Sequence, residues 1–144
     1  MRFTLPRLSW LAGALCLVLF AASIARAQDP QTTAVQAAAR EWLVFVDGGD
    51  SRAAWGAAGK KFQSAIAVAG WADALKKEQT RLGRTVRRTV GPTRFQNKLP
   101  GSPDGEYAQV LFNTVFANKA NGRETLTLER EEDGKWRVIG YFPR

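Results

Sequence analysis

The residue types that carry most acid–base and nucleophilic chemistry are scarce in this sequence. The chain contains no histidine, and its one cysteine, Cys16, lies in an apolar run near the N-terminus. Serine–histidine–aspartate and cysteine–histidine arrangements are excluded, because both need an imidazole base. Zinc and iron–sulfur sites also lack their usual ligands. We therefore expect no cofactor and no metal, and any chemistry rests on carboxylates, tyrosines and arginines.

The carboxylates form one dense group and one spaced group. The dense group ends at the turn dipeptide Asp133-Gly134, so it predicts a solvated hairpin tip rather than a calcium site, which needs several convergent oxygens. Four other acids, which a glycosidase-type pair could use, lie beside glycines and are expected at helix ends and turns. The dense group is Glu129, Glu131, Glu132 and Asp133, and the spaced group is Asp47, Asp50, Asp104 and Glu106.

Aromatic side chains are the better candidates for ligand contact. Four tryptophans fall on apolar stripes, which favours core packing over the lining of an apolar pocket. They are Trp42, Trp55, Trp71 and Trp136. Trp55 lies in a segment with two glycines, which predicts a weak helix where a lid or rim could form. The candidate ligand-binding residues are Trp55, Trp71 and Tyr107.

Basic residues gather between positions 76 and 94. They could bind an anionic partner such as lipid head groups, lipopolysaccharide or nucleic acid, although a solvated helix end and strand face explain the pattern more simply. No interleaved aromatic platform accompanies them, as single-strand binders usually need, so nucleic acid is not an expected partner. The candidate anionic-surface patch is Lys76, Lys77, Arg81, Arg84, Arg87 and Arg88.

The N-terminus has the pattern of a secretory signal peptide. Arg2 and Arg7 precede the uncharged run Leu11–Ala22, and Ala25-Arg26-Ala27 is a small-x-small cleavage signal. Cleavage after residue 27 leaves residues 28–144 as one domain, which is expected to be periplasmic or secreted. The alternative is an uncleaved anchor, in which case this segment is the membrane contact.

Removing the signal changes the composition. Residues 28–144 keep 18 of the 21 basic side chains and all 13 acidic ones. They hold no cysteine, so the domain has no disulfide and must be held by its core.

The last third of the chain predicts three antiparallel strands. Alternating apolar residues mark Tyr107–Ala117, Arg123–Arg130 and Lys135–Phe142. Asn121-Gly122 and Asp133-Gly134 are the expected turns, because both dipeptides tolerate positive φ. One predicted inner face joins three sets of residues: Ala108, Val110, Phe112 and Phe116; Leu126 and Leu128; and Trp136, Val138, Gly140 and Phe142.

Helices and one more strand are expected before this unit. The helices are predicted from Thr33 to about Asp47, around Trp55, and from about Gly70 to Leu82. Asp50 is the expected N-cap of the second helix. A strand over Arg84–Val90 is interrupted at Gly91-Pro92, which predicts a bulge or an edge position, before Phe95–Leu99 resumes it. The fold class is α+β, with three N-terminal helices packed on one face of a curved antiparallel sheet of about four strands.

The sequence resembles the short exported bacterial proteins grouped as domain-of-unknown-function family 4019. The matching segments are Glu41–Leu43, Val46–Asp50, Trp55, Phe62, Trp71, Leu82-Gly83, Leu99–Tyr107 and Asp133–Tyr141. Ser51-Arg52 and Val68–Gly70 depart from the family pattern at two helix starts. The family has no established activity, so the resemblance carries over no catalytic residues. The order of helices is also similar to the NTF2-like and cystatin-like superfold, which implies a pocket.

Three functions remain open from the sequence. The leading one is an exported, non-catalytic envelope domain that binds a partner protein or a small apolar ligand in a helix–sheet pocket. The second is a small NTF2-like enzyme that uses Asp, Tyr or Arg in a cone-shaped pocket. The third is a basic domain that associates with anionic envelope surfaces.

Overall fold

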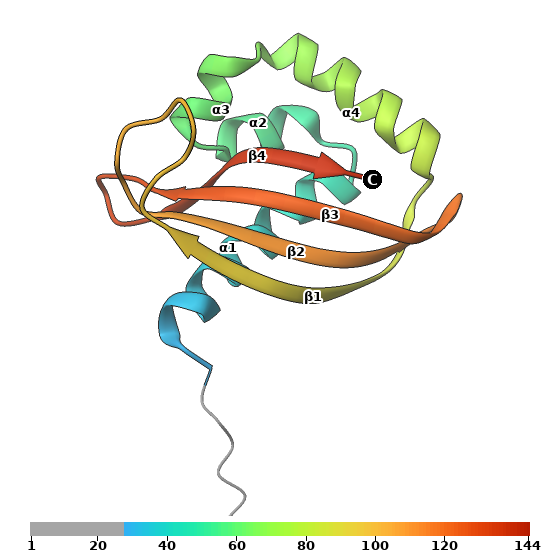
Figure 1. Cartoon of the computed structure of the whole chain (residues 1–144). Coiled ribbons are helices and arrows are strands. Elements are labelled where there is room, and N and C mark those ends of the chain that lie inside the picture. Colours follow the sequence, from blue (N-terminus) through green and yellow to red (C-terminus); the bar gives the residue numbers. More distant parts are fainter. Residues whose placement is uncertain (1–27) are drawn as a thin grey trace, which may run out of the picture.

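The computed structural model describes residues 28–144, and the predicted signal segment lies outside them. Four helices come first along the chain and four strands follow (Figure 1). The elements are α1 (Pro30–Asp47), α2 (Ser51–Ala57), α3 (Lys60–Ala65), α4 (Val68–Leu82), β1 (Thr85–Gln96), β2 (Tyr107–Phe116), β3 (Lys119–Arg130) and β4 (Trp136–Pro143). Among residues 28–144, no helix is both long and apolar enough to cross a membrane.

The strands form one antiparallel sheet in the order β1-β2-β3-β4, which curves but does not close (Figure 1). Residues of α1 to α4 share a single core with the inner face of this sheet. The predicted α+β class is therefore confirmed. There are four helices rather than three, because Ala58 and Gly59 are extended and separate α2 from α3. The Gly59 N–H instead donates to the Val138 carbonyl of β4, at 2.8 Å.

Helix boundaries follow the capping residues. α1 begins earlier than predicted, because the Asp29 side chain accepts from Thr32 N–H at 3.0 Å and Pro30 suits the first turn. It ends at Asp47 as predicted. Asp50 caps α2 as predicted, since its side chain accepts from Ala53 N–H at 2.9 Å. α4 begins at Val68 without a side-chain cap, two residues before the predicted start.

The turn predicted at Asn121-Gly122 is wrong. The β2–β3 turn lies at Ala117 and Asn118, and β3 already includes Asn121 and Gly122. Gly122 is needed there for space, because a Cβ at this position would lie 2.5 Å from Cδ2 of Phe116. The other predicted turn is confirmed, with Gly134 at φ 77°.

Bulges decide which side chains face the core. β1 is one continuous edge strand whose register shifts between Val90 and Thr93, so the predicted bulge and edge position are both confirmed. In β4 the prediction fails beyond Val138. Thr127 pairs with Gly140 and Leu128 with Val138, so Ile139 is an extra residue and the alternation reverses after it.

Reversal of the alternation exchanges the last two aromatic residues of β4. Tyr141, rather than Phe142, packs against the core, and Phe142 is 58% exposed. Tyr141 joins Trp42, Phe62 and Trp71 in an aromatic cluster with ring centroids 5.1 to 6.2 Å apart. The bulge therefore places a tyrosine hydroxyl inside the molecule.

Substitution of Gly122 tests this packing. We expect Gly122→Ala to lower the free energy of unfolding by about 3 kcal/mol, because the added methyl meets both the Phe116 ring and the Thr114 carbonyl. Gly56→Ala is the matched control. No atom lies within 4 Å of a Cβ at Gly56, so a gain of about 0.5–1 kcal/mol is expected from the better helix former. Urea unfolding measures both, and equal effects would contradict the packing described here.

Candidate functional site

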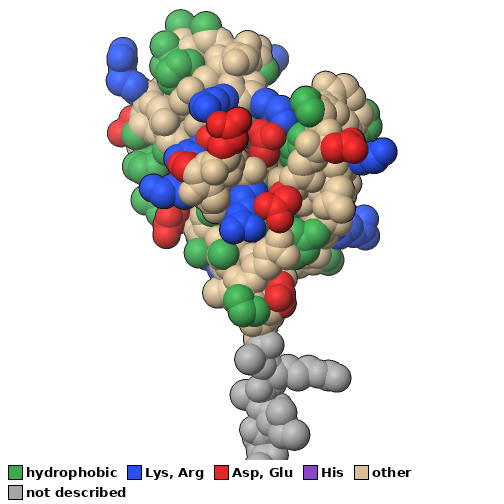
Figure 2. Space-filling view, turned by 90° about the vertical axis from the view of Figure 1, so that its left-hand side faces the viewer, with side chains coloured by type: hydrophobic (Ala, Val, Ile, Leu, Met, Phe, Trp, Pro, Cys, Tyr) green, Lys and Arg blue, Asp and Glu red, His purple; other side chains and the backbone are tan. Residues whose placement is uncertain are grey.

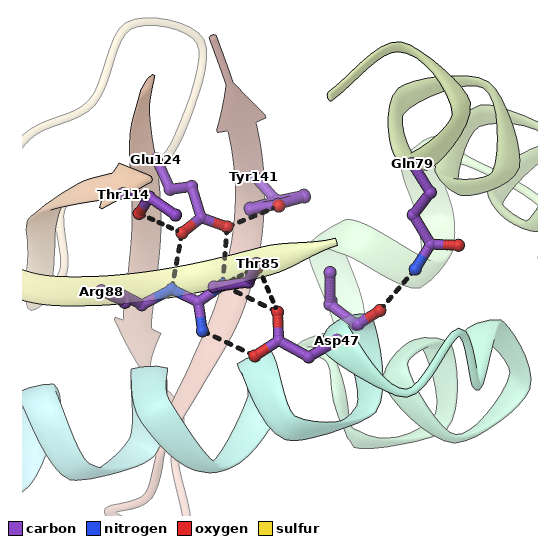
Figure 3. A network of polar contacts seen from close by, with 8 residues as sticks. Asp47, Gln79, Thr85, Arg88, Thr114, Glu124 and Tyr141 are labelled. Atoms are coloured by element: carbon purple, nitrogen blue, oxygen red, sulfur yellow. Dashed lines mark hydrogen bonds and ion pairs between the residues drawn. The ribbon is translucent and has the colours of Figure 1, made fainter. Parts of the chain in front are cut away.

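A carboxylate that is fully buried lies at the centre of the site. Glu124 of β3 is 0% exposed, and its two side-chain oxygens accept four hydrogen bonds (Figure 3). Oε2 accepts from Arg88 Nε at 2.6 Å and from Thr114 Oγ1 at 2.6 Å. Oε1 accepts from Arg88 Nη2 at 3.0 Å and from the Tyr141 hydroxyl at 2.8 Å. These four donors fill the hydrogen-bonding capacity of a carboxylate.

Arg88 connects this carboxylate to the end of α1. Its Nη1 donates to Asp47 Oδ2 at 2.7 Å and its Nη2 donates to Asp47 Oδ1 at 2.8 Å. Thr85 Oγ1 donates to Asp47 Oδ1 at 3.0 Å. One guanidinium thus joins two carboxylates from different elements, in the bidentate geometry that arginine favours. We call Asp47, Thr85, Arg88, Thr114, Glu124 and Tyr141 the Glu124 polar network; Thr114 and Glu124 are buried, whereas Asp47 is exposed.

A cavity of about 200 Å³ lies beside this network. Asp47, Thr85 and Tyr141 belong to both, so one wall of the cavity is part of the network. The remaining lining comes from the end of α1, the second half of α4, the α4–β1 connection and the end of β2: Val46, Leu75, Glu78, Gln79, Leu82, Gly83, Arg84 and Phe116. Gln79 is fixed, because its Nε2 donates to the Val46 carbonyl at 2.7 Å (Figure 3).

The network sets the protonation of its members. Burial raises the pKa of Tyr141 far above the ordinary 10.0, and the neighbouring Glu124 carboxylate raises it further. The phenol therefore keeps its proton at neutral pH. Burial disfavours the charged form of Arg88, but hydrogen bonds to Asp47 and Glu124 outweigh burial and raise its pKa. The network therefore holds a charged guanidinium and a neutral phenol.

The available chemistry is narrow, although Asp, Arg and Tyr do meet at the cavity. The Tyr141 hydroxyl donates to Glu124, and the guanidinium of Arg88 is held between two carboxylates. Asp47 Oδ2 accepts from Arg88 alone among the described residues, so it retains acceptor capacity. A general base needs such an acceptor within reach of a substrate proton. Among residues 28–144, no group of three or more Asp, Glu, His or Cys side chains could hold a metal ion.

The predicted ligand-binding residues do not come together, and none lines this cavity. Trp55 Nε1 donates to the Ile66 carbonyl at 2.9 Å. Trp71 is 6% exposed and belongs to the aromatic cluster. Tyr107 is 1% exposed, and its hydroxyl donates to the Pro103 carbonyl and accepts from Lys61 Nζ, both at 2.7 Å.

Lys61 fastens α3 to the sheet. Its Nζ donates to Glu129 Oε1 at 2.5 Å and lies 4.7 Å from the centre of the Tyr107 ring. Burial opposes the charged form, but the hydrogen bonds to Glu129 and Tyr107 outweigh burial and raise the pKa of Lys61. It is therefore a protonated structural contact rather than an amine nucleophile.

The predicted basic patch contains one residue that the structure separates from the others. Arg88 belongs to the Glu124 polar network, and its side chain is 14% exposed. The inclusion of Arg88 in a surface patch is therefore corrected, because its guanidinium is held between the buried Glu124 and Asp47 at the end of α1. The remaining members are exposed: Lys76, Lys77, Arg81, Arg84 and Arg87.

Glu131, Glu132 and Asp133 lie at the hairpin before β4, as predicted, whereas Glu129 lies within β3 and pairs with Lys61. Arg137 binds Glu131 and Asp133 there, with nitrogen–oxygen distances of 2.8 and 2.7 Å. The hydrogen bond from Arg137, assisted by the Lys135 N–H, lowers the pKa of Asp133 to about 2. Ion pairs with Arg137 therefore hold the hairpin tip in place.

Sequence reasoning missed Glu124 and Tyr141, for different reasons. Extending the alternation of Leu126 and Leu128 by one step toward the N-terminus places Glu124 on the inner face, so that signal was available. No alternation could find Tyr141, because the bulge at Ile139 reverses the pattern.

Comparison with known proteins gives a family and a fold. A family model described as a protein of unknown function (DUF4019) matches residues 38–141. No curated protein matches the chain. The solved structure of ActVI-ORFA from Streptomyces coelicolor is similar with a TM-score of 0.50 and 17% identity, over 79% of this chain and 93% of that one. This supports the predicted NTF2-like fold, and at such identity it shows the fold alone.

Loss of Arg88 tests the energetic role of the network. We expect Arg88→Met to lower the free energy of unfolding by about 3–5 kcal/mol, because it leaves Glu124 buried without a counter-charge. Arg81→Met is the control, since it removes the exposed pair with Glu78 and should cost at most about 1 kcal/mol. Chemical denaturation measures both, and similar small losses would show that Glu124 does not depend on Arg88.

The raised pKa of Tyr141 predicts a loss of stability in alkali. Above pH 10.0, the ordinary tyrosine pKa, the unfolded chain releases this proton and the folded chain keeps it, so stability falls as pH rises. The Tyr141 contribution approaches about 1.4 kcal/mol per pH unit. Urea unfolding between pH 8 and 11 should therefore give a steeper decline for the wild type than for Tyr141→Phe. Equal declines of the two proteins would contradict the raised pKa of Tyr141.

Proposed function

We propose that this chain, which belongs to the family described as protein of unknown function (DUF4019), is an exported domain that binds a small, largely apolar ligand in its cavity without transforming it. The observation that carries the proposal is the pairing of apolar cavity walls with a polar wall in which Asp47, Thr85 and Tyr141 are held by hydrogen bonds within the protein. Such a site can hold a ligand and orient it, while offering few groups for reaction.

The walls favour an apolar body of modest size. Val46, Leu75, Leu82 and Phe116 supply aliphatic and aromatic surface. A cavity of about 200 Å³ exceeds the roughly 150 Å³ that accommodates benzene in an engineered protein core. A ligand of this size buries little area, so we expect an affinity of about millimolar for a minimal probe.

The polar wall supports binding over catalysis. The Tyr141 hydroxyl is committed to Glu124, and the raised pKa of Tyr141 disfavours a phenolate. Arg88 cannot bind a substrate carboxylate without giving up Asp47 or Glu124. Breaking the pair with Glu124 leaves a buried charge without its partner, at a cost of about 3–5 kcal/mol, whereas the pair with the exposed Asp47 contributes less.

Export is the part of the proposal that rests on residues 1–27, which combine a basic start, an apolar run and a cleavage signal. The first described helix begins at Pro30, after the predicted cut that follows Ala27. Removal of the segment would therefore leave every described helix and strand whole. A protein partner at the same surface is the competing occupant.

Titration with 1-hexanol tests the cavity as a binding site. We expect saturable shifts in the nuclear magnetic resonance signals of Leu75, Leu82 and Phe116, because these side chains line the cavity. Leu82→Phe should weaken binding by filling the space, and its fold can be checked by circular dichroism.

Val44→Phe is the matched control, since Val44 is 66% exposed on α1 and lines a different surface depression. It should bind hexanol like the wild type. Shifts scattered over the surface, or no saturation, would reject the cavity as a ligand site.

A further inference from the structure

We infer that the ligand of this cavity carries an anionic head group and that Arg84 binds it at the rim. This inference rests on the proposed function and names the class of ligand: an apolar body joined to a carboxylate or a similar anion. Arg84 lines the cavity, is exposed, and forms no ion pair with the residues that the structure describes.

The cavity lies at a strongly basic end of the molecule. At this end β1 begins, β2 turns into β3 and β4 ends, and the last two turns of α4 lie beside them. Nine basic side chains gather there: Lys76, Lys77, Arg81, Arg84, Arg87, Arg88, Lys119, Arg123 and Arg144. A cleft that is surrounded by charges of one sign attracts ions of the opposite charge from solution.

Three acidic side chains line the cavity or belong to the network beside it, and arginine engages each of them. Asp47 and Glu124 share Arg88, at 2.7 and 2.6 Å. Glu78 pairs with Arg81. Among the charged residues that line the cavity, Arg84 is thus the one left to a ligand, because Asp47 and Glu78 already have partners.

Two helix C-termini also face the cavity, and bare carbonyls there would favour a cation. Their carbonyls are largely occupied. The Leu82 carbonyl accepts from Asn118 N–H at 2.9 Å, and the Gln79 carbonyl accepts from Gly83 N–H at 2.8 Å. At the end of α1, the Val46 carbonyl accepts from Gln79 Nε2. These bonds weaken the negative ends of both helices and leave the basic side chains dominant.

The opposite end of the sheet has a different charge pattern. Figure 2 shows that end, where acidic and basic side chains lie side by side. Ion pairs there join Lys98 to Asp104, Arg130 to Glu106, and Arg137 to Glu131 and Asp133. Positive charge is therefore unbalanced at the end with the cavity, and the excess is local rather than general.

Three six-carbon probes with the same tail test the head group: hexanoate, 1-hexanol and hexylammonium. Nuclear magnetic resonance titration at low salt should show hexanoate binding about two- to five-fold tighter than hexanol, the effect of one exposed charge pair, with hexylammonium weakest. Arg84→Gln should remove the hexanoate advantage and leave hexanol unchanged. Arg87→Gln is the matched control, because Arg87 is exposed at the same end but does not line the cavity.

The outcomes separate the two proposals. If all three probes shift the cavity residues with equal affinity, the binding function stands and the anionic head group is rejected. If Arg84→Gln and Arg87→Gln weaken hexanoate equally, the rim role of Arg84 is rejected. If none of the probes shifts the cavity residues, the proposed function fails, and this inference fails with it.

Discussion

The buried pairing of Arg88 with Glu124 is the interaction on which the rest of the structure depends. A fully buried carboxylate is costly unless charge and hydrogen bonds compensate it. Here the compensation comes from every neighbouring element: Arg88 of β1, Thr114 of β2 and Tyr141 of β4. Arg88 then reaches Asp47 at the end of α1. The position of one side chain on β3 thus fixes three strands and a helix relative to one another.

The cavity follows from this constraint. Because Arg88 holds Asp47, the last turn of α1 is tied to the start of β1, and α4 passes over the gap between them with Gln79 bound to Val46. Apolar side chains line the gap without filling it, and network members form its polar wall. Stability and binding therefore use the same residues, which explains why the polar groups beside the cavity have little capacity left for reaction.

Much of the fold could be predicted from sequence, because strand alternation and capping are local signals. Ala108, Val110 and Phe112 face the core as their spacing predicts, and Asp50 caps a helix as its position predicts. The site could be predicted only in part. Tyr141 turns inward because a bulge adds one residue to β4. The guanidinium of Arg88 reaches Glu124 two strands away, and a cluster of like charges in the sequence cannot show that pairing.

The most direct test of the account is a double-mutant cycle between Arg88→Met and Glu124→Leu, measured by urea unfolding. If the two side chains act as one unit, the double variant loses less stability than the two single losses combined, by about 2 kcal/mol or more, because replacing a whole buried pair avoids stranding a charge. Losses that simply add would contradict the claim that this pair organises the sheet, the end of α1 and the cavity.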